Sequence, residues 1–265
     1  MILLIDAEKR KIMFARAKSI VKKNLEHRDR LIINAIHSLD DLEKEINQLC
    51  ERLKDWYGIT FPELESILPE PDKYASMVLA LVKNASEEER LKITSKEKLD
   101  QILSVKADSM GAAMNEADLT PVLSLAESIV ELYQLRLAIE AYLEIICKEV
   151  CPNLTYLCGA LLTARFLGMA GSIEQLAEMP ASTIQVIGAE KALFKHIRRG
   201  TAPPKHGIIF QHPLISNADK DKRGKIARAL SAKMAIAAKA DAFTHHFIAE
   251  KLMDDLNKRL KEINA

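Results

Sequence analysis

The sequence predicts an all-α protein, and three observations carry this fold class. Glycine and proline contribute only nine residues each to a chain of 265. Hydrophobic residues make up 48% and charged residues 28%, with many Leu, Ile, Ala, Glu and Lys, a mixture that favours helices and opposes disorder. Two long segments repeat apolar residues at heptad spacing, which is typical of helices paired in a coiled coil. A chain of this length can bury a core in one large domain or two smaller ones.

Residues 1–23 are predicted to form a short N-terminal segment. An apolar run, MILLID, precedes a charged turn and the sequence KIMFARA, which suits a small β-hairpin and the entry to a helix. The apolar run is too short for a signal peptide, and no run approaches the roughly 18 apolar residues that span a bilayer. We therefore expect a soluble, cytoplasmic protein.

Residues 24–150 are predicted to form a coiled-coil domain. The first heptad run extends from about Asn24 to Gly58, and the second starts at Pro121, with Thr120 as its N-cap. Shorter helices, roughly 61–119, separate the two, so we expect an antiparallel pair closed by an inserted helical cap. Heptad spacing also fits two helices buried in one ordinary bundle. The first seam comprises Leu39, Leu42, Ile46, Leu49, Leu53 and Trp56, and the second comprises Leu125, Ile129, Leu132, Ile139, Leu143, Ile146 and Val150.

Residues 151–265 are predicted to form a compact helical domain. Short helical units divided by glycines and one proline lead into a proline-punctuated loop, RRGTAPPKHGIIFQHPL, and a final pair of helices follows. Three of the four cysteines fall at the start of this domain or just before it. Since no second pair completes a tetrahedral zinc site, we expect reduced and mostly buried thiols at Cys50, Cys147, Cys151 and Cys158.

Positive charge is concentrated in one window of this domain. The chain has a net charge of +1, yet residues 188–233 hold eleven Lys and Arg against three acidic residues. A basic block on an otherwise acidic chain suggests a polyanion footprint, although a run of charges is more often a solvated face.

The candidate binding residues lie in the first half of that window. Lys191 and Lys195 stand one turn apart on a predicted helix with Arg198 near them, while Leu193 and Ile197 are expected to anchor the helix in the core. Gly188 precedes this helix, whose free amide groups favour phosphate. Glu190 either accepts from a base amino group or bonds locally to amides of the first turn. The loop then adds Lys205, His206, Gln211 and His212, two of which are imidazoles able to stack on unpaired bases.

Catalytic motifs are not evident. The sequence has no glycine-rich phosphate loop after a strand and no nucleophile beside a recognisable base. His245, His246 and Glu250 resemble part of a metal triad but lack the i, i+4 histidine pair of zinc proteases, so we interpret them as a polar helix face. Nucleic-acid contact is the function that the residues favour.

Several motifs together resemble one family. The segment from Cys151 to Ile215 resembles, along nearly all of its residues, the Nop domain of the archaeal core scaffold of box C/D small ribonucleoproteins (sRNPs). Further resemblance lies in WYGITFPEL (56–64), LSLAESIVELYQLRLAIEAYLE (123–144) and KIARALSAKMAIAAKADAF (225–243), so that it covers roughly residues 24–262.

The resemblance implies a non-catalytic scaffold. Such a scaffold dimerises through its coiled coil, holds the methyltransferase fibrillarin, and binds box C/D guide RNA together with a small kink-turn-binding protein for guide-directed ribose 2′-O-methylation. S-adenosylmethionine belongs to the methyltransferase only, and the basic helix after Asn217 helps to meet the small protein. The implied RNA-binding residues are Gly188, Ala189, Glu190, Lys191, Ala192, Lys195, Arg198, Lys205, His206, Gln211 and His212, with His212 stacking on a base. The implied dimer contacts are Leu42, Leu49, Leu125, Leu132 and Ile139.

Two departures from the family pattern and two alternatives accompany this hypothesis. Lys195 stands where the family element usually has arginine, which keeps a phosphate contact but gives up a bidentate fork. The N-terminal domain that docks fibrillarin looks abbreviated. The same glycine-divided helices also resemble a helix-hairpin-helix DNA-binding unit of repair factors, although the turn here is Ile187-Gly188-Ala189 and not Gly-x-Gly. A purely structural coiled-coil dimer is the second alternative.

Overall fold

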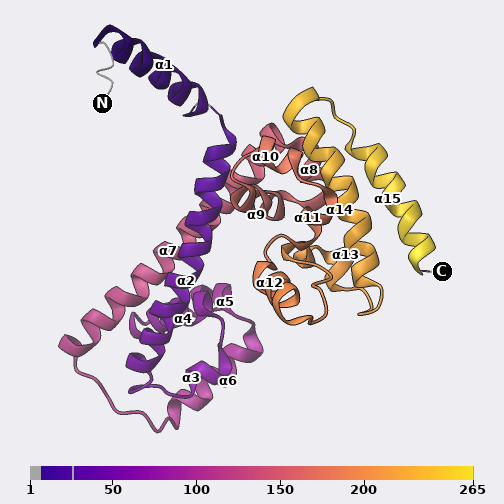
Figure 1. Cartoon of the computed structure of the whole chain (residues 1–265). Helices are drawn as coiled ribbons and strands as arrows, with labels where there is room; N and C mark the ends of the chain where they lie inside the picture. Colours follow the sequence, from indigo (N-terminus) through magenta and orange to yellow (C-terminus); the bar gives the residue numbers. More distant parts are fainter. Residues whose placement is uncertain (1–6, 26, 265) are drawn as a thin grey trace. The chain divides into compact units, whose positions relative to one another are not determined.

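The computed structural model describes residues 7–25 and 27–264, and all regular elements in these ranges are helical (Figure 1). The all-α prediction is therefore confirmed. The predicted hairpin is not: KIMFARA lies inside helix α1 (Ala7–Leu25), and the MILLID run falls outside the described residues.

The chain divides into two compact units. The middle unit is Ser38–Ala141, and the terminal unit joins the residues before it, to His37, with those from Tyr142 onward. Both boundaries fall inside the two long helices α2 (Asp29–Tyr57) and α7 (Glu116–Val150), not near residues 23 and 150 as the sequence suggested. Charge separates in the same way, because the middle unit has a net charge of −10 and the terminal unit +11.

The middle unit contains the expected helical cap between the long helices. Glu43 of α2 accepts from Arg136 of α7 at 3.0 Å, and Arg136 also pairs with Glu140 at 2.7 Å. The cap consists of α3 (Leu64–Ile67), α4 (Pro71–Val82), α5 (Glu87–Ile93) and α6 (Lys96–Ala107). Fully buried Tyr57, Phe61 and Tyr74 lie in the core that these helices share with α2 and α7.

The heptad register predicted for α2 is partly wrong. Tyr57 is 1% exposed and continues the buried series from Leu53, whereas Trp56 is 40% exposed. A spacing of three or four residues fits both positions equally well, so the pattern alone does not choose between neighbouring aromatic rings. Helix α7 also begins earlier than predicted, at Glu116, where the Asn115 side chain accepts from the Asp118 amide at 2.8 Å. Pro121 therefore lies within the helix.

The residues assigned to dimer contacts have partners within the chain. Leu49, Leu125 and Leu132 are half-buried against the core of the middle unit. Leu42 and Ile139 are also half-buried. Heptad side chains that pack against the partner helix of the same chain serve its own fold first, and self-association remains a proposal.

The terminal unit surrounds one central helix. α14 (Arg223–Lys239) packs against α8, α10, α11 and α15 (Figure 1). The other helices of the unit after α7 are α8 (Pro152–Cys158), α9 (Ala160–Ala170), α10 (Ile173–Glu178), α11 (Ala181–Val186), α12 (Glu190–Arg199), the 3-10 turn η1 (Ile208–Gln211), α13 (Pro213–Ser216), the π-helical turn η2 (Ala240–Thr244) and α15 (Ala249–Asn264). Small residues on α14, such as Ala227, Ala237 and Ala238, are fully buried and let its neighbours approach closely.

The buried carboxylate of Asp241 stabilises this unit. Asp241 accepts from the amides of Asn153 and Leu154 and from the Asn153 side chain at 2.7 to 3.1 Å, which joins η2 to the start of α8. The four cysteines of the chain are free and buried, as predicted. Burial raises the pKa of the Cys158 thiol to about 12, so it stays protonated and unreactive at neutral pH.

Candidate nucleic-acid interface

Helix α12 and the loop after it form a segment whose two ends are hydrogen-bonded to each other. We call these contacts the base of the segment. The amide of Gly207 donates to the Gln185 carbonyl and that of Ile208 to the Ile187 carbonyl, both at 2.9 Å. The side chain of Gln185 donates to the Lys205 carbonyl at 2.7 Å. Glycine is needed on both sides of the base: Gly188 has a φ of +84°, and a Cβ there would stand 2.4 Å from the Ile208 side chain. The segment 188–206 therefore projects as a loop whose two ends are fixed by these hydrogen bonds.

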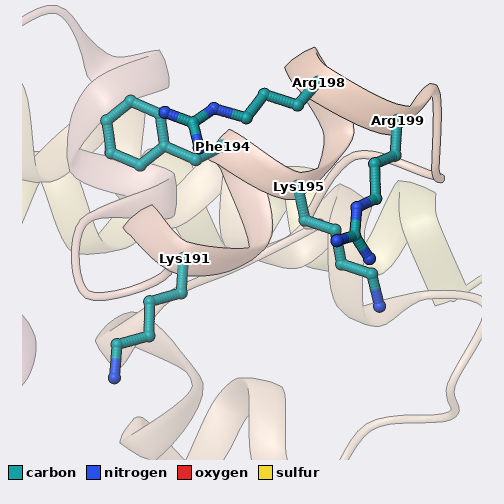
Figure 2. Close-up of a pocket in the computed structure, with 5 residues that line it drawn as sticks. All are labelled: Lys191, Phe194, Lys195, Arg198 and Arg199. Carbon is teal, nitrogen blue, oxygen red and sulfur yellow. The ribbon is translucent and has the colours of Figure 1, made fainter.

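Four cations line a hollow on the outer face of α12. Lys191, Lys195, Arg198 and Arg199 surround it together with Phe194, and its volume is about 550 Å³. Figure 2 shows Lys195 and Arg199 extending on the same side of the helix, as residues four apart do. Among the described residues, none of these four cations forms an ion pair or a side-chain hydrogen bond. Uncompensated cations around a hollow fit an anionic ligand such as a phosphate group.

The helix is not anchored as the sequence suggested. No residue of α12 is buried: Leu193 is half-buried, Ile197 is 69% exposed and Phe194 is 59% exposed. The expectation that Ile197 reaches the core was wrong, because the hydrogen bonds at the base, and not apolar packing, fix the position of α12. His196 adds a contact to the Thr201 carbonyl at the far end of the helix.

Glu190 forms a local hydrogen bond at the start of α12. Its carboxylate accepts from the Gly188 amide at 2.6 Å, which is the local alternative and not a contact to a base. Ala189 is the N-cap, and no side chain caps the helix. The amide groups of Glu190, Lys191 and Ala192 lie in the first turn, where a helix has no internal partners for them. The Glu190 carboxylate lowers the positive potential at this end, which leaves the lysines as the stronger anion ligands.

The loop presents one of its two histidines. The His206 ring stacks on Phe210, with centroids 4.8 Å apart and an interplanar angle of 18°. The guanidinium of Arg223 lies over the same Phe210 ring at 5.2 Å. Burial, and then the nearby charge of Arg223, lowers the pKa of His206. A half-exposed, neutral imidazole with one face supported offers a flat surface to an unpaired base.

His212 is a structural residue and does not stack on a base. Its ring is 9% exposed, Nδ1 accepts from the Leu214 amide at 3.1 Å, and Nε2 lies 3.0 Å from the Leu157 carbonyl. These two contacts assign the proton to Nε2 and use both ring nitrogens. The sequence could not separate it from His206, because both are imidazoles in the same polar loop.

The remaining candidates, Lys205 and Gln211, do not line the hollow on α12. Lys205 is exposed, and Gln211 is exposed while its Oε1 accepts from Arg165 at 2.7 Å. The sequence places Arg199 in the basic window, and the resemblance places Phe194 in the element that approaches the RNA, but neither was among the predicted RNA-binding residues. The spacing of four residues from Lys195 to Arg199 was the signal that could have identified Arg199.

A second basic hollow lies between α14 and α15. Its volume is about 430 Å³. Lys225 and Arg228 stand on one side, and Lys233 pairs with Asp255 across it at 3.1 Å. The hollow therefore has two cations that lack ion pairs in the described part of the chain.

Neither a metal site nor a membrane span occurs in the part of the chain that the structure describes. No group of three or more His, Cys, Asp or Glu side chains comes close enough there to hold a metal ion, so His245, His246 and Glu250 form no such cluster. Of the helices described, none is long and apolar enough to cross a bilayer.

Comparisons with known proteins agree with this architecture. Residues 38–262 match the Nop family model, described as "snoRNA binding domain, fibrillarin". An uncharacterized NOP5 family protein of Methanocaldococcus jannaschii is 44% identical over 248 residues, 93% of this chain. Nucleolar protein 58 of Lodderomyces elongisporus is 42% identical and that of Saccharomyces cerevisiae 40% identical, each over 81% of this chain. The chain spans 60% of the length of the archaeal relative and 42% of each yeast relative.

A solved structure gives the same result. The crystal structure of a fibrillarin/Nop5p complex matches with a TM-score of 0.56 and 30% identity, over 96% of this chain and 77% of that one. With a family model that covers most of its residues, and with these relatives, the chain belongs to the Nop family.

Proposed function

We propose that this chain is a non-catalytic scaffold of a box C/D sRNP, which binds kink-turn guide RNA and gathers the proteins that methylate a target ribose. The observation that carries the proposal is the set of four cations around the hollow on α12, which have no ion-pair partner in the described part of the chain. The Nop family model, described by its binding of snoRNA, supports an RNA ligand for that surface.

The geometry suggests how the surface holds RNA. Lys191 and Lys195 contact phosphates, which fixes the position of the RNA without reading its sequence. His206, supported by Phe210, stacks on an unpaired base beside them. The hydrogen bonds at Gly207 and Ile208 hold the end of this segment against the terminal unit, which supports the proposal that the cations and the ring contact the same RNA.

The proposal assigns partners to other surfaces. The small kink-turn-binding protein meets the basic face of α14, where Lys225 and Arg228 line a hollow. Fibrillarin is the proposed methyltransferase partner, since the matching crystal structure is a fibrillarin complex, and S-adenosylmethionine belongs to that partner. A second copy of the chain joins through the coiled coil of α2 and α7. We place the particle in the archaeal cytoplasm, given the similarity to an archaeal NOP5 family protein.

Binding of the full chain to a kink-turn RNA that carries its small protein tests this function. The double variant Lys191→Ala, Lys195→Ala removes two phosphate contacts, so the slope of log K against log salt should fall by about 2 and affinity by on the order of 10-fold. A matched control is Lys44→Ala with Lys83→Ala, because both lysines are already paired, with Asp41 and Glu127. Equal affinity of the two variants across a salt titration would contradict the proposal.

A further inference from the structure

Helix α1, like α12, is rich in cations that lack ion pairs among the described residues. It carries seven Lys and Arg and a single glutamate, a net charge of +6 in 19 residues. The described cations of α1 are all exposed, and none forms an ion pair or hydrogen bond within the described residues. They are Lys9, Arg10, Lys11, Arg16 and Lys18.

Most cations of the two longest helices, α2 and α7, have carboxylate partners, with Arg30 of α2 as an exception. On α2, Lys44 pairs with Asp41 at 2.9 Å and Arg52 with Asp55 at 3.2 Å. On α7, Lys148 pairs with Glu144 at 3.3 Å. Carboxylates at i±3 or i±4 neutralise these cations locally, so they need no external partner. Unneutralised cations of like sign repel one another along α1, and an anionic ligand relieves that repulsion.

The spacing of the cations in α1 places four of the five described ones in two stripes. Lys9 and Arg16 are seven residues apart and share one side of the helix, and Lys11 and Lys18 share another. Since each residue turns the helix by about 100°, the two stripes stand on opposite sides. A single acidic protein surface reaches one stripe at a time, whereas two phosphate backbones that border a groove reach both.

Two exposed apolar side chains lie between the stripes, on either side of Arg10. Phe14 is 75% exposed and Met13 is 60% exposed. Proteins that hold nucleic acid without reading its sequence combine a cationic track with aromatic rings on which bases stack. This side chain composition, like the charge, fits RNA.

We infer that α1 is a second RNA-binding element, which contacts phosphates on both sides of a groove in the RNA that α12 also binds. The inference rests on the proposed function for the identity of the polyanion. It is independent of α12 in its evidence, because it depends on other residues in another helix.

A charge-neutralised variant of the full chain tests the inference. Lys9→Gln, Lys11→Gln, Arg16→Gln and Lys18→Gln together remove both stripes while keeping good helix formers. The probe is a kink-turn RNA with an extended duplex stem, bound to its small protein. The slope of log K against log salt should become less steep, its magnitude decreasing by about 2 to 4, and affinity at low salt should decrease by at least about 10-fold. The stripe variants Lys9→Gln/Arg16→Gln and Lys11→Gln/Lys18→Gln should each produce about half of this change.

The matched control removes the same charge from paired positions. Lys44→Gln, Arg52→Gln, Lys73→Gln and Lys83→Gln replace cations of the middle unit that already have carboxylate partners. Far-UV circular dichroism checks that helix content is equal in all variants. The inference is overturned when the α1 variants have the same salt slope of RNA binding as the control. It is also overturned when they lose self-association alone, because the acidic middle unit of a second copy would then be the ligand of α1.

The inference and the proposed function fail separately. Loss of affinity in the Lys191→Ala, Lys195→Ala variant, with none in the α1 variants, refutes the inference and leaves the function intact. Loss in the α1 variants alone supports α1 and removes the role proposed for α12. Unchanged affinity in both refutes both.

Discussion

Gly207 and Ile187 lie so close together that a Cβ atom on Gly207 would stand 1.8 Å from the carbonyl oxygen of Ile187. This approach allows the amide of Ile208 to reach the same carbonyl at 2.9 Å. Because α12 has no buried residue, these backbone contacts, and not a hydrophobic core, position its cations.

Gly207→Ala should therefore disturb the candidate RNA interface, because it disrupts the backbone contacts that hold the α12 segment. The added methyl group meets backbone atoms that cannot rotate away, so the free energy of unfolding should fall by about 1–3 kcal/mol. RNA affinity should fall as well, although no cation has been removed. Urea denaturation and RNA titration measure the two effects. Gly224→Ala is the control, since its nearest neighbour is the flexible end of Lys205 at 3.4 Å. It lies in α14 and should stabilise the chain by about 0.4–1 kcal/mol. A Gly207→Ala protein as stable as the Gly224→Ala protein would show that the backbone contacts between Gly207 and Ile187 can rearrange to accept a methyl group.

Sequence patterns predicted the features that depend on composition and period. The low glycine and proline content indicated helices, and the eleven cations of residues 188–233 indicated the face on which Lys191 and Lys195 lie. Both are properties of a segment, and tertiary structure does not have to be known to read them.

The predictions failed where a single tertiary contact decides between similar residues. Tyr57 and not Trp56 entered the core, and His206 and not His212 remained accessible. Ile197 matched the apolar side of a helix, yet no element covers it. Helical spacing gives the relative direction of side chains but not what packs against each face. The basic character of α1 is a property of its sequence, but the short apolar run and charged turn before KIMFARA suggest a hairpin there.

The two histidines of the loop should separate by readout. His206→Ala removes the stacking ring and should weaken RNA binding by about 5- to 100-fold, with little change in stability. His212→Ala leaves the Leu157 carbonyl and the Leu214 amide without partners and should lower the free energy of unfolding by about 2–4 kcal/mol. RNA titration and chemical denaturation of both variants provide the measurement. If His212→Ala binds RNA poorly while remaining as stable as the unsubstituted chain, the structural role assigned to its ring is wrong.

Stability should decline below neutral pH because of His212. Burial lowers the pKa of this imidazole from its ordinary value of 6.5, so the unfolded chain binds the proton more readily than the folded one. The stabilisation from the neutral ring is fully present above pH 6.5 and is lost as the pH falls toward the lower pKa of the folded state. His206 acts in the same direction. Denaturation at pH 7.5 and pH 5.5 should show a smaller loss for His212→Gln than for the unsubstituted chain. An equal loss would mean that this imidazole does not control the dependence.

The Asp241 carboxylate joins η2 to the start of α8. It is 2% exposed and accepts from the Asn153 amide, the Asn153 side chain and the Leu154 amide. Asp241→Asn keeps the shape but replaces one accepting oxygen by an NH₂ group that faces donors, so the free energy of unfolding should fall by about 2–4 kcal/mol. Asp255→Asn is the matched control: its carboxylate pairs with Lys233 at the surface, and the change should be much smaller. Denaturation followed by circular dichroism measures both. Since Asp241 lies outside the hollow on α12, RNA affinity of the folded Asp241→Asn protein should stay unchanged, and a loss there at full folding would mean that η2 also contributes to the RNA surface.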